Sequence, residues 1–146
     1  MAIVAYTDPQ KRGLVGGHAN SEEWNSVSRL ANGDVIGAGQ PVSRAGDDGI
    51  ADFNGTTYLG VTIRTIDYDT TAGFAEYATV PVMTMGVMWV AAGEAVDAGE
   101  PAGYDLATDR WGTVSVTYLA VPGVEFDSSS TAAGLVKIRI NRPAGA

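Results

Sequence analysis

The 146-residue sequence contains no cysteine, and this absence removes several kinds of chemistry. Disulfide scaffolds, thiolate zinc sites, iron–sulfur clusters and cysteine nucleophiles all need a thiol. Histidine is almost absent as well, because His18 is the single one and lies beside Gly16 and Gly17. A general base needs a rigid position within hydrogen-bond reach of its target, so a histidine in a glycine-rich stretch is a poor catalytic candidate. Coordination of a transition metal would then depend on carboxylates alone.

Basic residues are also scarce, with 9 lysines and arginines against 17 acidic residues and a net charge of −8. Nucleic-acid binding requires a basic face, so we expect no nucleic-acid partner. The acidity argues equally against an anionic membrane surface, and no run of about 18 uncharged apolar residues could cross a bilayer. The first residues lack the basic start and apolar core of a signal peptide, which predicts that the protein stays where it is made. The simplest effect of the charge is solubility.

The residues that are abundant favour β structure. The sequence has 16 valines, 7 isoleucines and 13 threonines against 6 leucines, and its 19 glycines can form turns between short strands. We therefore predict an all-β fold. In the clearest alternation, Val136, Ile138 and Ile140 should face inward. Pro81 should mark a sheet edge or a bulge, because proline cannot donate to a central ladder. The predicted strands cover residues 58–66, 74–85, 87–90, 113–121 and 136–140.

The first part of the chain differs from the rest. Residues 1–32 contain Gly13, Gly16 and Gly17 close together and have few residues able to pack a core, which predicts an extended N-terminal arm. Within the arm, residues 20–30 are the one fair helix candidate, with Asn20 and Glu23 placed as a capping box. Residues 33–146 should then form a single β domain.

An internal repeat runs through this domain. Gly33–Pro41 resembles Gly93–Pro101, and at the same offset of 60 the segment Thr57–Val61 resembles Thr117–Val121. Both copies have the order turn, short strand, Ala-Gly turn, proline, loop and long strand. The spacing predicts two similar β units, at residues 33–66 and 93–126. Two such units would close a small β-barrel or sandwich, of which a jelly-roll-like arrangement is one form, and would thereby remove exposed sheet edges.

No reactive centre is evident in the sequence. Asp67 and Asp69 could bind calcium or serve as the acid–base pair of an acidic hydrolase, but Thr70, Thr71 and Gly73 follow them and favour a solvated turn. There is neither a nucleophile elbow nor a phosphate-binding loop. We therefore expect that the protein is not an enzyme and uses no cofactor and no metal.

Trp111 lies in the sequence Asp-Arg-Trp-Gly, which is typical of a hairpin turn. An exposed tryptophan in such a turn would mark an interface. A different interpretation is a small carbohydrate-binding β-sandwich that uses Trp111 and the nearby Tyr104 as an aromatic platform. Loss of glycan binding on Trp111→Ala would favour that interpretation.

The order of strands and turns over residues 33–140 resembles the capsid cement, or decoration, proteins of tailed bacteriophages. The pattern is a strand ending in "Gly, apolar, apolar, Trp, Val", followed by "Ala-Val-x-Ala-Gly-x-Pro" and a glycine loop. The segments that have this likeness are Gly33–Pro41, Tyr58–Val61, Val80–Val90, Glu94–Pro101, Tyr104–Gly112, Val121–Phe126 and Ala133–Ile138.

The resemblance implies a structural protein on the outer surface of a phage head, made in the cytoplasm of the bacterial host. There it would bridge neighbouring major capsid proteins against the pressure of the DNA. It also implies a homo-oligomer, for which we favour a trimer and leave a dimer open, with the arm reaching a neighbouring subunit. The residues that we predict at the capsid or subunit interface are Tyr6, Leu14, His18, Trp24 and Trp111.

Overall fold

The computed structural model describes residues 14–20, 23–32, 35–65 and 72–141, and every structural statement below concerns these residues. All of their regular structure is β-strand, which confirms the all-β prediction. The strands are β1 (Asn25–Ala31), β2 (Pro41–Ala45), β3 (Gly49–Asp52), β4 (Tyr58–Thr62), β5 (Thr79–Ala92), β6 (Pro101–Asp105), β7 (Arg110–Thr113), β8 (Leu119–Phe126) and β9 (Gly134–Ile140).

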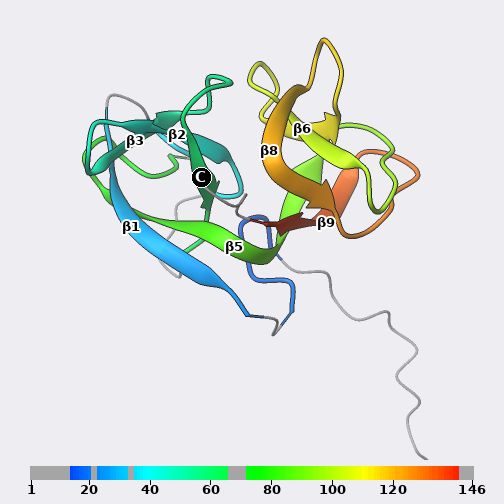
Figure 1. The fold of residues 1–146 in the computed structure, drawn as a ribbon, viewed down its shortest axis with the longest axis horizontal. Coiled ribbons are helices and arrows are strands. Elements are labelled where there is room, and N and C mark those ends of the chain that lie inside the picture. Colours follow the sequence, from blue (N-terminus) through cyan, green and yellow to red (C-terminus); the bar gives the residue numbers. More distant parts are fainter. Residues whose placement is uncertain (1–13, 21–22, 33–34, 66–71, 142–146) are drawn as a thin grey trace, which may run out of the picture.

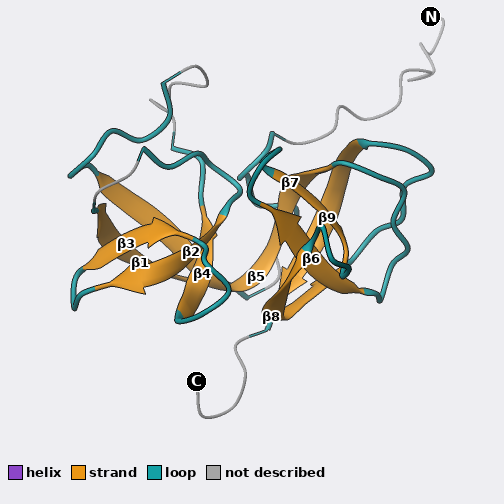
Figure 2. Cartoon of the chain, turned by 90° about the horizontal axis from the view of Figure 1, so that it is seen from above, coloured by secondary structure: helices purple, strands orange, loops and turns teal. Residues whose placement is uncertain are grey.

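The strands close into two small barrels that share β5. The sheet order is β1-β3-β2-β4-β5-β7-β6-β8-β9, and additional β1–β5 and β5–β9 pairings close a ring on each side. Residues 79–85 of β5 pair with β1 and β4, whereas residues 86–92 pair with β9 and β7. Figures 1 and 2 show the first barrel (β1–β4 with the start of β5) beside the second (β6–β9 with its end). The barrel class is confirmed, but the two predicted units do not close one barrel together, because each lies in a ring of its own.

The two barrels repeat the same local geometry. The turn glycines Gly39 and Gly99 both have positive φ, 73° and 90°, which glycine adopts without strain. The amide of Gly39 donates to the carbonyl of Thr62 at 2.9 Å, and that of Gly99 donates to the carbonyl of Phe126 at 2.7 Å. The Ala-Gly-x-Pro turn thus bonds to a later strand in each barrel, with the two glycines at the offset of 60 and their acceptors four residues further apart.

The apolar core spans the junction of the barrels. One buried cluster contains Phe53, Val61 and Met83 from the first barrel together with Trp111, Ile138 and other residues of the second. A smaller cluster fills the rest of the first barrel. Because each barrel alone has few residues to bury, a shared core and a shared strand stabilise both.

Several predicted elements agree with the structure and three do not. Val136, Ile138 and Ile140 are buried in β9, as predicted. Residues 20–30 are no helix, because Asn25–Ala31 form β1, which pairs with β5 and β3. The strand predicted over residues 113–121 is wrong between β7 and β8, where the chain turns.

Pro81 also differs from its prediction. It lies inside β5 and is paired with Ser28 of β1, not at a sheet edge. On the side of β4, its carbonyl still accepts from the amide of Ile63 at 2.9 Å, directly after β4 ends at Thr62. The missing N–H therefore falls at the end of the β4–β5 ladder, where no further pair of residues follows.

Candidate functional site

The part of the predicted arm that the structure describes is packed against β5. The amide of Gly16 donates to the carbonyl of Trp89 at 2.8 Å, and the amide of Trp89 donates to the carbonyl of Gly17 at 2.9 Å. A side chain at position 16 would put Cβ 2.8 Å from Cβ of Ala38, so the glycine is what permits this contact. Residues 14–19 and β1 therefore belong to the folded body, in place of the free arm expected up to residue 32.

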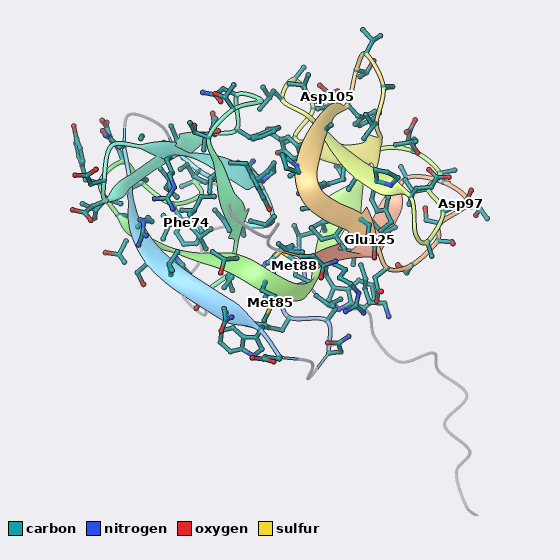
Figure 3. The ribbon with its side chains drawn as sticks, in the orientation of Figure 1. Phe74, Met85, Met88, Asp97, Asp105 and Glu125 are labelled. Atoms are coloured by element: carbon teal, nitrogen blue, oxygen red, sulfur yellow. The ribbon has the colours of Figure 1, made fainter. Side chains whose placement is uncertain are left out.

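This packing brings two of the predicted interface residues together. The His18 and Trp24 rings lie with their centroids 4.3 Å apart, and both side chains are exposed. Trp24 keeps 46% of its surface accessible, and we call this exposed pair the N-terminal patch; Leu14, in the same segment as His18, keeps 59%. Beside it, a shallow depression is lined by Glu23, Met85, Gly86, Arg139, Ile140 and Asn141. Figure 3 shows Met85 at the bend of β5, below the two barrels.

Trp111 is buried, and its predicted exposure in a hairpin turn is wrong. Only 1% of its surface is accessible, and its Nε1–H donates to the carbonyl of Gly39 at 2.9 Å, which ties the second barrel to the first. Because β7 faces the junction of the barrels, packing places this side chain inside the core. Trp111 therefore cannot contact a partner in this fold.

Tyr104 is buried beside Trp111, in an edge-on arrangement with a centroid separation of 5.3 Å. Its hydroxyl donates to Asp109 at 3.2 Å. Burial and the Asp109 carboxylate raise the pKa of Tyr104 well above its usual range. The aromatic platform of the carbohydrate-binding interpretation is thus enclosed, and the pair serves the core.

Three of the sequence candidates, Tyr6, Asp67 and Asp69, lie outside the described residues. Within the residues described, no group of three or more histidines and carboxylates could hold a metal ion. No helix in that part of the chain is long and apolar enough to cross a membrane.

The sequence reasoning missed a second accessible apolar surface, on the loop between β7 and β8. Val116 is fully exposed, and Val114 and Leu119 each keep 41% of their surface accessible. The signal was present in the sequence, since Val-Ser-Val-Thr alternates apolar and polar residues. The same alternation is typical of a strand with one face buried, which is why it predicts a strand over residues 113–121.

Comparison with known proteins agrees with this architecture. The sequence model of the family described as "Structural cement protein (E217 gp24/Pam3 gp6)" matches residues 4–141. The chain belongs to this family of phage structural cement proteins. It therefore has a structural role in the phage virion, in association with the capsid.

The fold of this cement protein is similar to that of a chain in a solved phage capsid. A chain from "The capsid of Myoviridae Phage XM1" superposes with a TM-score of 0.70 and covers 97% of this chain and 99% of its own length. The two sequences are 17% identical, so the likeness establishes the fold alone. No curated protein matches the sequence.

Proposed function

We propose that the protein binds the outer surface of a phage head and bridges neighbouring major capsid proteins, which stabilises the head against the pressure of its DNA. The family match over residues 4–141 carries this proposal. The exposed rings of the N-terminal patch supply a surface of the kind that binds partners. The net charge of −8 would keep the protein soluble in the host cytoplasm before assembly.

Co-sedimentation with heads tests the proposal directly. Purified protein mixed with undecorated heads should sediment with them and raise the temperature at which the heads open. Electron microscopy of the mixture should place the added density on the outside, over contacts between capsid subunits. Protein that remains in the supernatant at saturating concentration would contradict the proposal.

The proposal includes a homo-oligomer, with a trimer favoured over a dimer. Several weak contacts made by one oligomer would combine through effective concentration into near-permanent attachment. Sedimentation equilibrium measures the number of chains in the oligomer, both for the purified protein and for protein released from decorated heads. A monomer in both states would contradict this part of the proposal.

We further propose that the residues before the packed segment reach a neighbouring subunit. Residues 1–13 can span at most about 45 Å. Truncation of residues 2–12 should weaken binding to heads and leave the unfolding temperature unchanged, because Gly16 and Gly17 keep their bonds to β5. Head binding measured for the truncated and full chains decides the point, and undiminished binding by the truncated chain would contradict it.

A further inference from the structure

The loop between β7 and β8 has a fixed shape. The amide of Ser115 donates to the carbonyl of Tyr118 at 3.0 Å, and the Ser115 hydroxyl accepts from the amides of Thr117 and Tyr118 at 3.2 and 3.3 Å. Residues 115–118 therefore form a closed turn whose tip carries Val116. A loop that is already ordered loses little conformational freedom when it binds a partner.

Tyr118 anchors this turn on the second barrel. Its side chain and backbone lie so close to Gly93, Gly103 and Gly112 that a Cβ atom at any of the three would meet Tyr118 at 2.7 Å. The absence of a side chain at these three glycines therefore leaves the space that Tyr118 occupies. The tyrosine fixes the base of the loop and leaves the valines at its tip free to contact another molecule.

The repeat shows that folding does not require valines in this loop. The connection from β3 to β4 (residues 53–57) and that from β7 to β8 (residues 114–118) have the same length. In the first barrel, every exposed position of the connection is polar or glycine, from Asn54 to Thr57. In the second, Val114 is 41% and Val116 100% exposed. The difference points to a contact that only the second loop makes.

Charges around the loop indicate the kind of partner. Glu94 accepts from the amide of Thr113 at 2.8 Å, and Glu100 accepts from its hydroxyl at 2.9 Å. Asp105 follows Tyr104, which pairs with Leu119 of β8. Figure 3 shows Asp105 at the top of the second barrel, on the side opposite Met85. Arg110 of β7 lies on the same surface, beside Asp105 and Tyr118, and is outnumbered there by the three carboxylates. Two copies meeting through this surface would place an acidic excess against an acidic excess, whereas a basic rim would complement it.

We propose that the β7–β8 loop, through Val114, Val116 and Leu119, docks into an apolar depression with a lysine- and arginine-rich rim on the major capsid protein. This inference rests on the proposed function and adds a second contact surface to it. The protein would then contact the head through two of its own surfaces. One is the N-terminal patch at the bend of β5, and the other is the loop at the opposite end of the second barrel.

Val116→Asp and Val116→Ser test the loop, with Val35→Asp as the matched control. Val35 is also well exposed, at 60%, but lies in the first barrel. Both Val116 variants should weaken binding to undecorated heads about tenfold or more, as expected for truncation of an interface anchor. Val35→Asp should bind like the wild type. Because Val116 is fully exposed, its variants should also keep the wild-type urea midpoint.

Each outcome of this experiment has a distinct meaning. Wild-type protein that fails to bind heads removes the proposed function and, with it, this inference. Wild-type binding with equal binding by Val116→Asp overturns the loop contact alone. If Val116→Asp instead dissociates the oligomer in sedimentation equilibrium, the occupant of the loop is a second copy of the chain and the capsid partner is wrong. Tenfold weaker head binding with an unchanged oligomer supports the inference.

Discussion

At the scale of single residues, Trp111 shows how one side chain can join two units. Its indole N–H donates to the carbonyl of Gly39, 72 residues away in the chain. The indole also packs in the cluster that contains residues of both barrels. A hydrogen bond from a buried indole is directional, so it fixes the orientation of one barrel on the other as well as contributing stability.

Trp111→Phe should destabilise the protein by about 1–3 kcal/mol, because the carbonyl of Gly39 loses its indole partner in a buried site. Urea unfolding followed by circular dichroism measures the change. Trp24→Phe is the matched control: its side chain is 46% exposed, and surface changes of this kind stay within about 0.5 kcal/mol. Equal midpoints for the two variants would contradict the structural role of Trp111.

The buried tyrosines Tyr58 and Tyr104 predict a loss of stability at alkaline pH. Burial raises the pKa of both phenols above their usual value, and Asp109 raises that of Tyr104 further. In the unfolded chain both ionise near pH 10, before they can in the folded chain. The contribution of these two neutral phenols to the free energy of unfolding is therefore complete below about pH 10 and is lost as the pH rises above it.

Urea midpoints measured from neutral to alkaline pH should fall above about pH 10. Phenolate absorbance should show that these two tyrosines remain neutral until the chain unfolds. The double variant Tyr58→Phe/Tyr104→Phe should flatten the decline. If the double variant loses stability with pH as steeply as the wild type, the decline has another origin.

At the scale of elements, the strand β5 decides the architecture. It runs through both barrels, and its bend lies at Gly86, where φ is +138°. A Cβ atom there would lie 2.8 Å from Cβ of Trp24 and 2.9 Å from the sulfur of Met83. The glycine therefore permits both the unusual backbone angle and the close approach of the residue before β1.

Gly86→Ala should cost about 1–3 kcal/mol, because strain at φ +138° adds to the crowding against Trp24 and Met83. Gly46→Ala serves as the matched control. Gly46 also has positive φ, +76°, but no atom lies near its missing Cβ, so the control retains backbone strain without crowding. Thermal unfolding compares the two. A Gly86→Ala midpoint no lower than that of Gly46→Ala would contradict the role of the bend.

At the scale of the whole molecule, the two barrels are joined by three shared features. They share β5, the bond from Trp111 to Gly39 and a core cluster with residues of both. Neither barrel can open without exposing part of the other's core.

We predict that the protein unfolds in a single cooperative transition. Far-ultraviolet circular dichroism and tryptophan fluorescence should give the same urea midpoint, because Trp111 lies at the junction and reports on both barrels. Trp24→Phe removes the exposed probe and leaves Trp89, half-buried in the shared strand β5, together with the buried Trp111. Two separated transitions would contradict a common folding unit.

The sequence by itself determined the β class, the repeat at an offset of 60, the inward face of β9 and the family. These follow from alternation, turn glycines and the order of segments, which are local properties of the chain. The wrong predictions have the same origin, because the spacing of residues along the chain does not show which residues pack against them in space. The valines at 114 and 116 alternate like a buried strand but lie in an exposed turn.

Only the tertiary structure decided that each repeat closes its own barrel, that β5 is shared, and that Gly16 and β1 belong to the body. Burial of Trp111 and exposure of Val116 were decided at the same level. The physical reason is that closure and burial depend on contacts between residues far apart in the chain, such as Trp111 with Gly39 and His18 with Trp24. The glycines at positions 16 and 86 permit close approaches of the same long-range kind, to Ala38 and to Trp24, and the need for glycine there can be seen only in the folded chain.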